Sequence, residues 1–291
     1  MGKPRRGVLI TGGNVDSMVA RYTAANKPRS EDDYSPNQKA GLRPDRAVLV
    51  YASLAREAFP KVRIILGGLE ASLRRFAHYD YWSDSVRGSY LIESGADVLV
   101  YGMGERTVLE VASGKDVKTI RGICYAAEKY DGDGMFCHSL EEVQASRHKY
   151  AAAFMTQYNE QDAATGKAVI QPHGDVLLIQ NPPAAPLETE ELDRASSLPY
   201  TRAAHPSYKN GIKAVEEVRF SIIHNRGCFG GCHFCSIAFH QGREVTARSH
   251  DSVLAEAEKS LQLLYLGCAS TATRYPARSS TRPITAAPKL G

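Results

Sequence analysis

The chain has 291 residues, of which 43% are hydrophobic and 23% charged, a composition typical of a globular protein with one large domain or two ordinary ones. The formal net charge is only +4 and the basic residues are scattered, so no dedicated nucleic-acid surface is predicted. No run approaches the roughly 20 apolar residues of a membrane span, and the first apolar run is too short for a secretory signal, so we expect a cytoplasmic protein without a membrane partner.

Short apolar runs alternate with helical patterns over the first hundred residues. Strands are predicted at 7–11, 62–66 and 97–101, each followed by glycines, and helices at 45–59 and 105–112. This alternation is typical of an α/β fold with a parallel, Rossmann-like sheet. Ligands of such sheets bind beyond the carboxyl ends of the strands, which is where these glycines fall.

The middle of the chain is less regular. Ser139 stands three residues before Glu142, the spacing of a capping box, and predicts a helix that continues through Tyr158. A strand is expected at 176–180, and the proline-rich residues 181–186 should form an extended connector.

The last regular elements surround a cysteine loop. We interpret residues 218–223 as the first strand of a barrel, with the loop at its carboxyl end, and Ser249 as the cap of a helix that extends to about Leu264. Residues 267–291 are rich in Ser, Thr, Ala, Pro and Arg and have no acidic residue. We expect a disordered tail there, or an aberrant one that arose by loss of the natural reading frame.

Three of the six cysteines, Cys228, Cys232 and Cys235, lie within eight residues and have no fourth thiol near them in sequence. Thiolates are the soft ligands that iron-sulfur clusters require, and a 4Fe-4S cluster held by three of them keeps one iron open. Gly230 and Gly231 can bring main-chain N–H groups close to cluster sulfurs. Half of the cysteines in one loop fit a reducing compartment and a metal better than a disulfide framework.

The alternative is a Cys3His zinc site, with His224, His233 or His240 as the fourth ligand. In that case the loop would belong to a structural or regulatory metal-binding module without turnover. Buried cysteines without a ligand are a third interpretation, although three thiols in a glycine-rich loop have no packing rationale.

Other candidate residues each have a functional and a structural interpretation. The aromatic run at 78–82 could line a ligand cleft or belong to a core or interface. Arg74 and Arg75 could meet a phosphate or carboxylate or lie on a solvated helix face. His205 and His240 could act as acid-base groups or be ordinary hydrogen-bonded residues. The remaining thiols are interpreted as ordinary buried or surface cysteines: Cys124, Cys137 and Cys268.

Longer stretches of the sequence resemble the YgiQ-type radical S-adenosylmethionine (SAM) proteins, whose substrate is unassigned. The resemblance covers roughly residues 7–266 and implies an N-terminal domain like a cobalamin-binding Rossmann unit, followed by a partial (β/α)6 radical SAM barrel. We therefore expect domains at 1–215 and 216–266, with the tail at 267–291. The matching motifs lie at residues 16–25, 39–46, 67–84, 198–202, 226–236 and 240–243.

The resemblance also implies a chemistry. Cys228, Cys232 and Cys235 would ligate the cluster, and the open iron would chelate SAM, whose reductive cleavage gives a 5′-deoxyadenosyl radical. Phe234 would pack beside the adenine or the cluster, with Gly230 and Gly231 in the same cofactor-binding loop. A reductant such as flavodoxin or ferredoxin would supply the electron.

Two departures from the family pattern qualify these expectations. The chain ends after the first expected barrel strand, the cluster loop and one helix, so it resembles a truncated copy that we expect to be inactive by itself. There is also no Asp-x-His-x-x-Gly pattern, by which many cobalamin domains present a histidine to cobalt, so corrinoid binding is doubtful.

Overall fold

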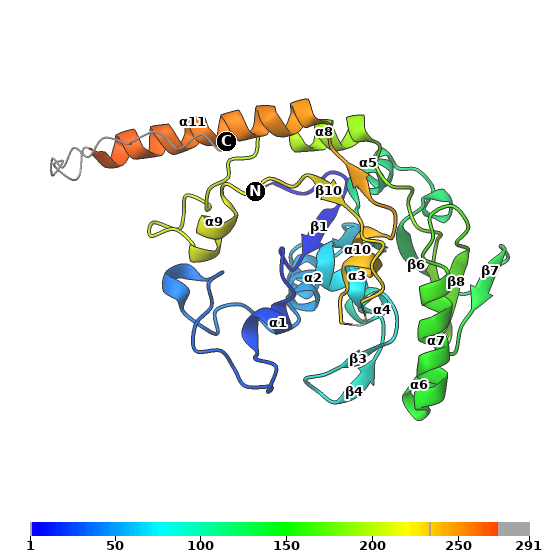
Figure 1. The fold of residues 1–291 in the computed structure, drawn as a ribbon. Coiled ribbons are helices and arrows are strands. Elements are labelled where there is room, and N and C mark those ends of the chain that lie inside the picture. Colours follow the sequence, from blue (N-terminus) through cyan, green and yellow to red (C-terminus); the bar gives the residue numbers. More distant parts are fainter. Residues whose placement is uncertain (1, 233, 273–291) are drawn as a thin grey trace, which may run out of the picture.

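A seven-stranded sheet organises the computed structural model, which describes residues 2–232 and 234–272 (Figure 1). The predicted parallel arrangement is confirmed for β1, β2 and β5, whereas β6 and β9 run antiparallel to their neighbours, so the sheet as a whole is mixed. In spatial order the strands are β1 (Val8–Thr11), β2 (Ile64–Gly67), β5 (Val98–Val100), β6 (Ile123–Ala127), β9 (Val176–Gln180), β8 (Ala168–His173) and β7 (Gly134–Phe136).

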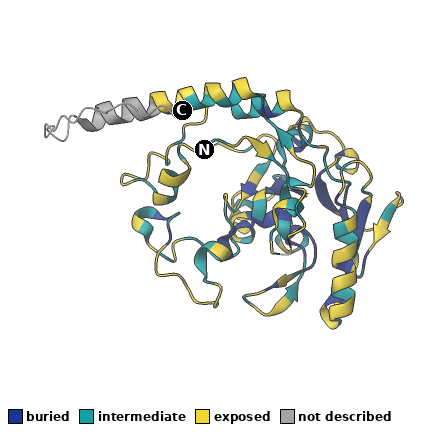
Figure 2. Ribbon diagram, in the orientation of Figure 1, coloured by how far each residue is buried: buried dark blue, intermediate teal, exposed yellow. Residues whose placement is uncertain are grey.

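Both faces of the sheet are covered, because successive side chains of a strand point to opposite sides. On β2, Ile64 and Leu66 pack into one apolar cluster and Ile65 packs into the other. The first cluster includes Val48 of helix α2 (Ala47–Ala58) and the second Val111 of helix α5 (Glu105–Ser113), so helices lie against each face. Figure 2 shows the buried residues concentrated in the strands and the helix surfaces that face them.

The helices predicted in the first half of the chain are present, together with short elements that no periodicity indicated. A two-stranded hairpin lies apart from the main sheet. These elements are α1 (Ser17–Arg21), η1 (Pro36–Gln38), α2 (Ala47–Ala58), α3 (Gly68–Leu73), β3 (His78–Asp80), β4 (Ser85–Arg87), α4 (Tyr90–Ser94), α5 (Glu105–Ser113) and η2 (Val117–Thr119).

The capping box at Ser139 is confirmed. The Ser139 hydroxyl accepts a hydrogen bond from the N–H of Glu142, and the Glu142 carboxylate accepts one from the N–H of Ser139. The expected single helix is divided into α6 (Leu140–Ala145) and α7 (Arg147–Asn159). Ser146 between them has extended backbone angles, and its hydroxyl caps α7 by accepting from the N–H of Lys149.

The predicted barrel strand at 218–223 is wrong. The chain there leaves α9 (Lys213–Val218) and continues without a strand as far as β10 (Asn225–Arg226). A barrel strand needs neighbours that satisfy its backbone, and the described residues place none beside this run. Three of its four apolar side chains are accordingly exposed: Val218, Phe220 and Ile223.

The last part of the chain follows the extended connector at 181–186, as predicted. The Ser249 hydroxyl accepts from the N–H of Ser252, which confirms the cap. The helix continues through Ala272, beyond Leu264, so residues 267–272 are helical rather than a tail. These elements are α8 (Thr189–Ser196), α10 (Ile237–Gln241), β11 (Thr246–Ala247) and α11 (His250–Ala272).

The rest of the expected tail, 273–291, lies outside the described residues, as does the reading-frame hypothesis attached to it. The domain division at residue 215 stays a prediction. Among the described helices, none combines the length and the apolar character needed to cross a membrane.

Candidate functional site

The cysteine loop is closed at its base by a short ladder. β10 pairs antiparallel with β11, and the N–H of Cys228 donates to the carbonyl of Gly242 at 3.1 Å. Gly227 has a φ of +85°, and a Cβ there would lie 1.9 Å from the carbonyl oxygen of Glu244. Only glycine therefore lets the two arms of the loop approach so closely. Arg226 adds an ion pair with Glu105 at the start of α5, which ties the base of the loop to the sheet.

Within the loop, two of the three sulfurs converge on Gly230. The N–H of Gly230 donates to Cys228 Sγ at 3.4 Å. A Cβ at Gly230 would lie 3.3 Å from Cys228 Sγ and 3.7 Å from Cys232 Sγ, so the missing side chain leaves room between them. Neither Gly230 nor its neighbour Gly231 has a positive φ in the part of the chain that is described.

The loop contains three thiols that could ligate a metal, but they are not gathered into a metal-binding arrangement. Cys228 and Cys235 are half-buried, Cys232 is exposed, and all three are free thiols. Among the described residues, no three His, Cys, Asp or Glu side chains are gathered closely enough to hold a metal ion. The donor chemistry fits an iron-sulfur cluster, since three free thiols flank a glycine cradle. The three sulfurs would have to come closer together to hold one.

The other described thiols have a different environment. Cys124 lies in β6 and Cys137 follows β7, and both side chains are buried. Burial disfavours the thiolate and raises the pKa of each to about 12. This confirms the interpretation of both as ordinary buried cysteines. The side chain of Cys268 is outside the described part of the chain.

Two phenylalanines of the loop face solvent. Phe234, which the resemblance places beside the adenine or the cluster, is 92% exposed, and Phe229 is 88% exposed. The contact predicted for Phe234 stays a prediction. Phe229 was missed, although its place directly after Cys228 could have marked it.

The histidines considered as a fourth zinc ligand are dispersed. The ring of His224 stacks on that of His250 with 6.4 Å between centroids, while His240 lines a cavity beside α10. His233 lies outside the described residues. His205 is exposed and its Nδ1 lies 2.8 Å from the hydroxyl of Ser207, a local turn contact.

Helix α10 holds the loop over the carboxyl ends of the parallel strands. The chain beyond β5 turns at Gly102, whose φ is +72°, and a Cβ there would lie 3.2 Å from the carbonyl oxygen of His240. On its other side, α10 places Phe239 against Phe154 and Tyr158 of α7, with ring centroids 5.3 and 5.7 Å apart. The edge at which the sequence predicted a ligand site is thus partly covered by α10 (Figure 1).

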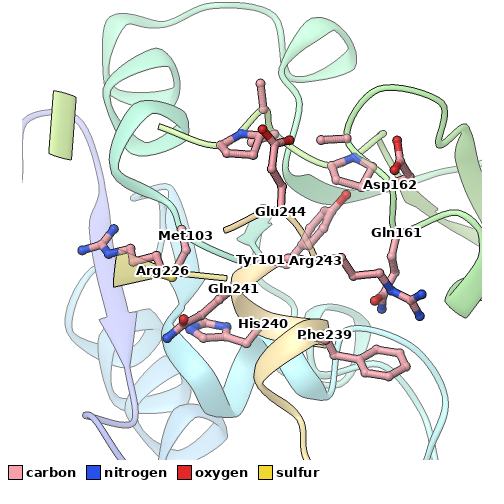
Figure 3. Close-up of a pocket in the computed structure, with 18 of the residues that line it drawn as sticks. Tyr101, Met103, Gln161, Asp162, Arg226, Phe239, His240, Gln241, Arg243 and Glu244 are labelled. Carbon is pink, nitrogen blue, oxygen red and sulfur yellow. The ribbon is translucent and has the colours of Figure 1, made fainter. Parts of the chain in front are cut away.

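A small cavity of about 90 Å³ remains between α10 and the sheet. Figure 3 shows His240 and Gln241 of α10 beside it, together with Tyr101, which follows β5, and Gln161, which follows α7. The Tyr101 hydroxyl donates to the carbonyl oxygen of Asn181 at 2.6 Å. Burial lowers the pKa of His240, with a smaller contribution from the guanidinium of Arg75.

Neither Arg74 nor Arg75 lies on a solvated helix face, so that interpretation is wrong. Arg74 forms a buried ion pair with Asp16. Arg75 donates from Nε to the Gln180 side-chain oxygen at 2.5 Å, and its guanidinium lies over the Tyr101 ring, 4.7 Å from the centroid. The sequence showed two adjacent basic residues but not that both point into the protein, because α3 ends at Leu73 and the chain turns there.

The aromatic run at 78–82 divides between the interior and the surface. His78 packs edge-on against buried Tyr90, with 5.5 Å between ring centroids, whereas Tyr79 and Tyr81 are exposed. Trp82 lies tilted against Tyr22 at 6.3 Å. This run belongs to the region of the β3–β4 hairpin and does not line the cavity beside α10.

Comparison with known proteins gives one family and several relatives. The Radical SAM N-terminal family matches residues 1–221. A UPF0313 protein of Clostridium perfringens is 48% identical over 271 residues, which are 89% of this chain and 41% of that protein. A UPF0313 protein of Clostridium botulinum is 48% identical over 268 residues, 88% of this chain and 42% of that protein. The chain therefore spans about two fifths of the length of these relatives.

Two solved structures of the radical SAM methyltransferase TsrM from Kitasatospora setae are also similar, each with 16% identity over 91% of this chain. The form with tryptophan substrate and a SAM analog gives a TM-score of 0.47 and is covered over 36% of its length. The form with cobalamin and a [4Fe-4S] cluster gives a TM-score of 0.46 and is covered over 37% of its length.

Proposed function

The chain belongs to the Radical SAM N-terminal family, and from that membership we propose that Cys228, Cys232 and Cys235 hold a 4Fe-4S cluster. The complete proteins that share this region then act as radical SAM enzymes on a substrate still to be found. When bound, such a cluster supplies an open iron for SAM and the electron that cleaves SAM to methionine and a 5′-deoxyadenosyl radical. Flavodoxin or ferredoxin is the proposed class of reductant.

One observation carries the proposal: the loop thiols are free and accessible, whereas the other described thiols are buried. A thiol must lose its proton and reach the metal to become a ligand. Cys228, Cys232 and Cys235 lie in a loop that a metal can reach, whereas burial keeps Cys124 and Cys137 from the metal and disfavours their thiolates.

The loop's own residues have defined tasks in this proposal. Gly227 and the β10–β11 ladder hold the base closed, and the N–H of Gly230 donates toward Cys228 Sγ, as backbone amides do around cluster sulfurs. Phe229 and Phe234 offer apolar surface that would exclude water once covered. No histidine ligand to cobalt is proposed, since the sequence lacks the Asp-x-His-x-x-Gly pattern.

The activity is tested on a complete relative, such as the UPF0313 protein of Clostridium perfringens. After anaerobic reconstitution, incubation with SAM and dithionite should release 5′-deoxyadenosine, and alanine at any of the three loop cysteines should abolish the release. A protein that carries one zinc and no iron, and releases no 5′-deoxyadenosine, would refute the proposal and favour a structural metal-binding module.

A further inference from the structure

Arg75 is a buried cation that has no acidic partner among the residues that the structure describes. Its side chain is nearly inaccessible, and within the described part of the chain it takes part in no ion pair. The contacts it makes are neutral: the Gln180 side-chain oxygen, the Ser72 carbonyl at 2.6 Å and the Tyr101 ring. Burial lowers its pKa because the charged form loses its hydration. Buried charges are normally paired with a charge of opposite sign.

Unpartnered amides line the cavity that Arg75 also lines. Gln161 is 8% exposed, and neither its Nε2 nor its Oε1 has a hydrogen-bond partner among the described residues. Gln180 is fully buried, and its Nε2 is likewise unpartnered within the described structure. Buried amides are nearly always hydrogen-bonded, so two such groups at one cavity indicate a missing partner.

Gln171 shows what a satisfied buried glutamine looks like in this protein. It lies on β8, beside β9, which carries Gln180, and is fully buried. Its Oε1 accepts from the N–H of Ala77 at 2.8 Å and its Nε2 donates to the carbonyl of His138 at 3.1 Å. The unmet amides are therefore specific to the cavity and not a general property of buried glutamines here.

The other charges at the cavity are balanced or exposed. Arg226 is paired with Glu105. Arg243 stacks over the Tyr158 ring at 4.0 Å, and it is exposed, as are Asp162 and Glu244. Arg75 is thus the charge that the cavity encloses, and it is positive.

We propose that this cavity binds an oxyanion, the carboxylate or phosphate group of a small ligand, between Arg75 and the amides of Gln161 and Gln180. A planar guanidinium suits such groups, and each amide nitrogen can donate to an anion oxygen. One water needs about 10–15 Å³ of such space, so a cavity of about 90 Å³ has room for a group of this size. The site does not depend on the cysteines and forms without a metal in the loop.

The test uses the 291-residue chain without iron, titrated calorimetrically with acetate and, separately, with inorganic phosphate at constant ionic strength. We expect one of the two to bind at one site, and which one binds identifies a carboxylate or a phosphate ligand. Gln161→Leu should weaken that binding at least tenfold. It should also raise the melting temperature of the anion-free protein, because an apolar side chain replaces two unmet polar atoms.

Gln171→Leu is the matched control. It removes two hydrogen bonds from a buried glutamine outside the cavity, so it should lower the melting temperature and leave the anion affinity unchanged. Arg75→Gln should abolish the anion binding, and if that variant fails to fold, Gln161→Leu alone decides the test. The proposal is overturned if neither anion binds the unaltered chain, or if Gln161→Leu binds as tightly as the unaltered chain.

Discussion

Asp16 and Glu70 join segments of the chain that are far apart in sequence. One Asp16 oxygen accepts from the N–H groups of Met18 and Val19 and so caps α1, while the other pairs with buried Arg74. The Glu70 carboxylate accepts from the N–H of Ser17 at 2.9 Å and from that of Val48 at 3.1 Å. Two of the motifs that carry the family resemblance therefore meet in one buried network.

Replacing Asp16 by Asn separates the cap from the charge. Asn caps a helix as well as Asp does, but Arg74 would keep a buried charge without its partner. We expect Asp16→Asn to lower the free energy of unfolding by about 3 kcal/mol in urea denaturation. Asp116→Asn, at an exposed cap of η2, should change it by less than about 0.5 kcal/mol. Equal small effects of both changes would show that the Asp16–Arg74 pair contributes nothing.

His78 makes stability depend on pH. Burial lowers its pKa to about 4 from an ordinary value of 6.5. The folded state holds the His78 ring neutral, whereas the unfolded chain can protonate it below pH 6.5. The contribution of His78 to the free energy of unfolding is therefore complete above pH 6.5 and is lost as the pH falls toward 4. A difference of this size corresponds to about 3 kcal/mol. Burial also lowers the pKa values of His173 and His240, so these residues too should make the folded protein less stable as the pH falls.

His78→Phe should remove the part of the pH dependence that comes from His78, so the free energy of unfolding should fall less steeply between pH 6.5 and 4. A phenyl ring can keep the contact with Tyr90, so the packing should be retained. Urea denaturation at several pH values measures it. The same change at exposed His148 should leave the slope as it was. An unchanged slope in His78→Phe would mean that His78 is not held neutral by burial.

At the scale of elements, the ladder of β10 and β11 decides whether the cysteine loop closes. Gly227→Ala would force a positive φ on alanine and place its Cβ against the Glu244 carbonyl. We expect the variant to lose most of the iron taken up on anaerobic reconstitution, although every cysteine is kept. Iron per chain, measured by elemental analysis, tests this.

Gly114→Ala is the control for that change. Gly114 ends α5 with a φ of +86°, and a Cβ there meets nothing within 4 Å. The Gly114→Ala change imposes a similar backbone strain, but it causes no clash and lies far from the loop in sequence. Iron uptake should therefore persist. If both variants keep their iron, closure of the loop base does not matter for the metal.

Local patterns predicted the elements that local interactions determine. The strands ending in glycines, the amphipathic helices and the capping box at Ser139 depend on neighbours within a few residues. The direction of β6 and β9 does not depend on such local neighbours, because the tertiary fold decides how strands pair. The prediction of a parallel sheet was therefore wrong for these two strands. Residues 218–223 have the apolar content of a strand but no partner strand among the described residues, so composition alone misled.

At the scale of the whole molecule, the fold brings together what the sequence separates. Arg75 follows α3, Gln161 follows α7, Gln180 ends β9 and His240 lies on α10, yet all four line one cavity. No spacing in the sequence relates them, which is why the cavity could not be predicted. The proposed cysteine ligands, in contrast, lie within eight consecutive residues, so their spacing could be recognised from the sequence.

The most direct test of the central claim is the iron and acid-labile sulfide content of this chain after anaerobic reconstitution. The unaltered chain and Cys137→Ala should each carry about four of both per chain, as expected for a 4Fe-4S cluster. Alanine at position 228, 232 or 235 should abolish them. One zinc per chain without iron, or iron that survives all three substitutions, would contradict the assignment.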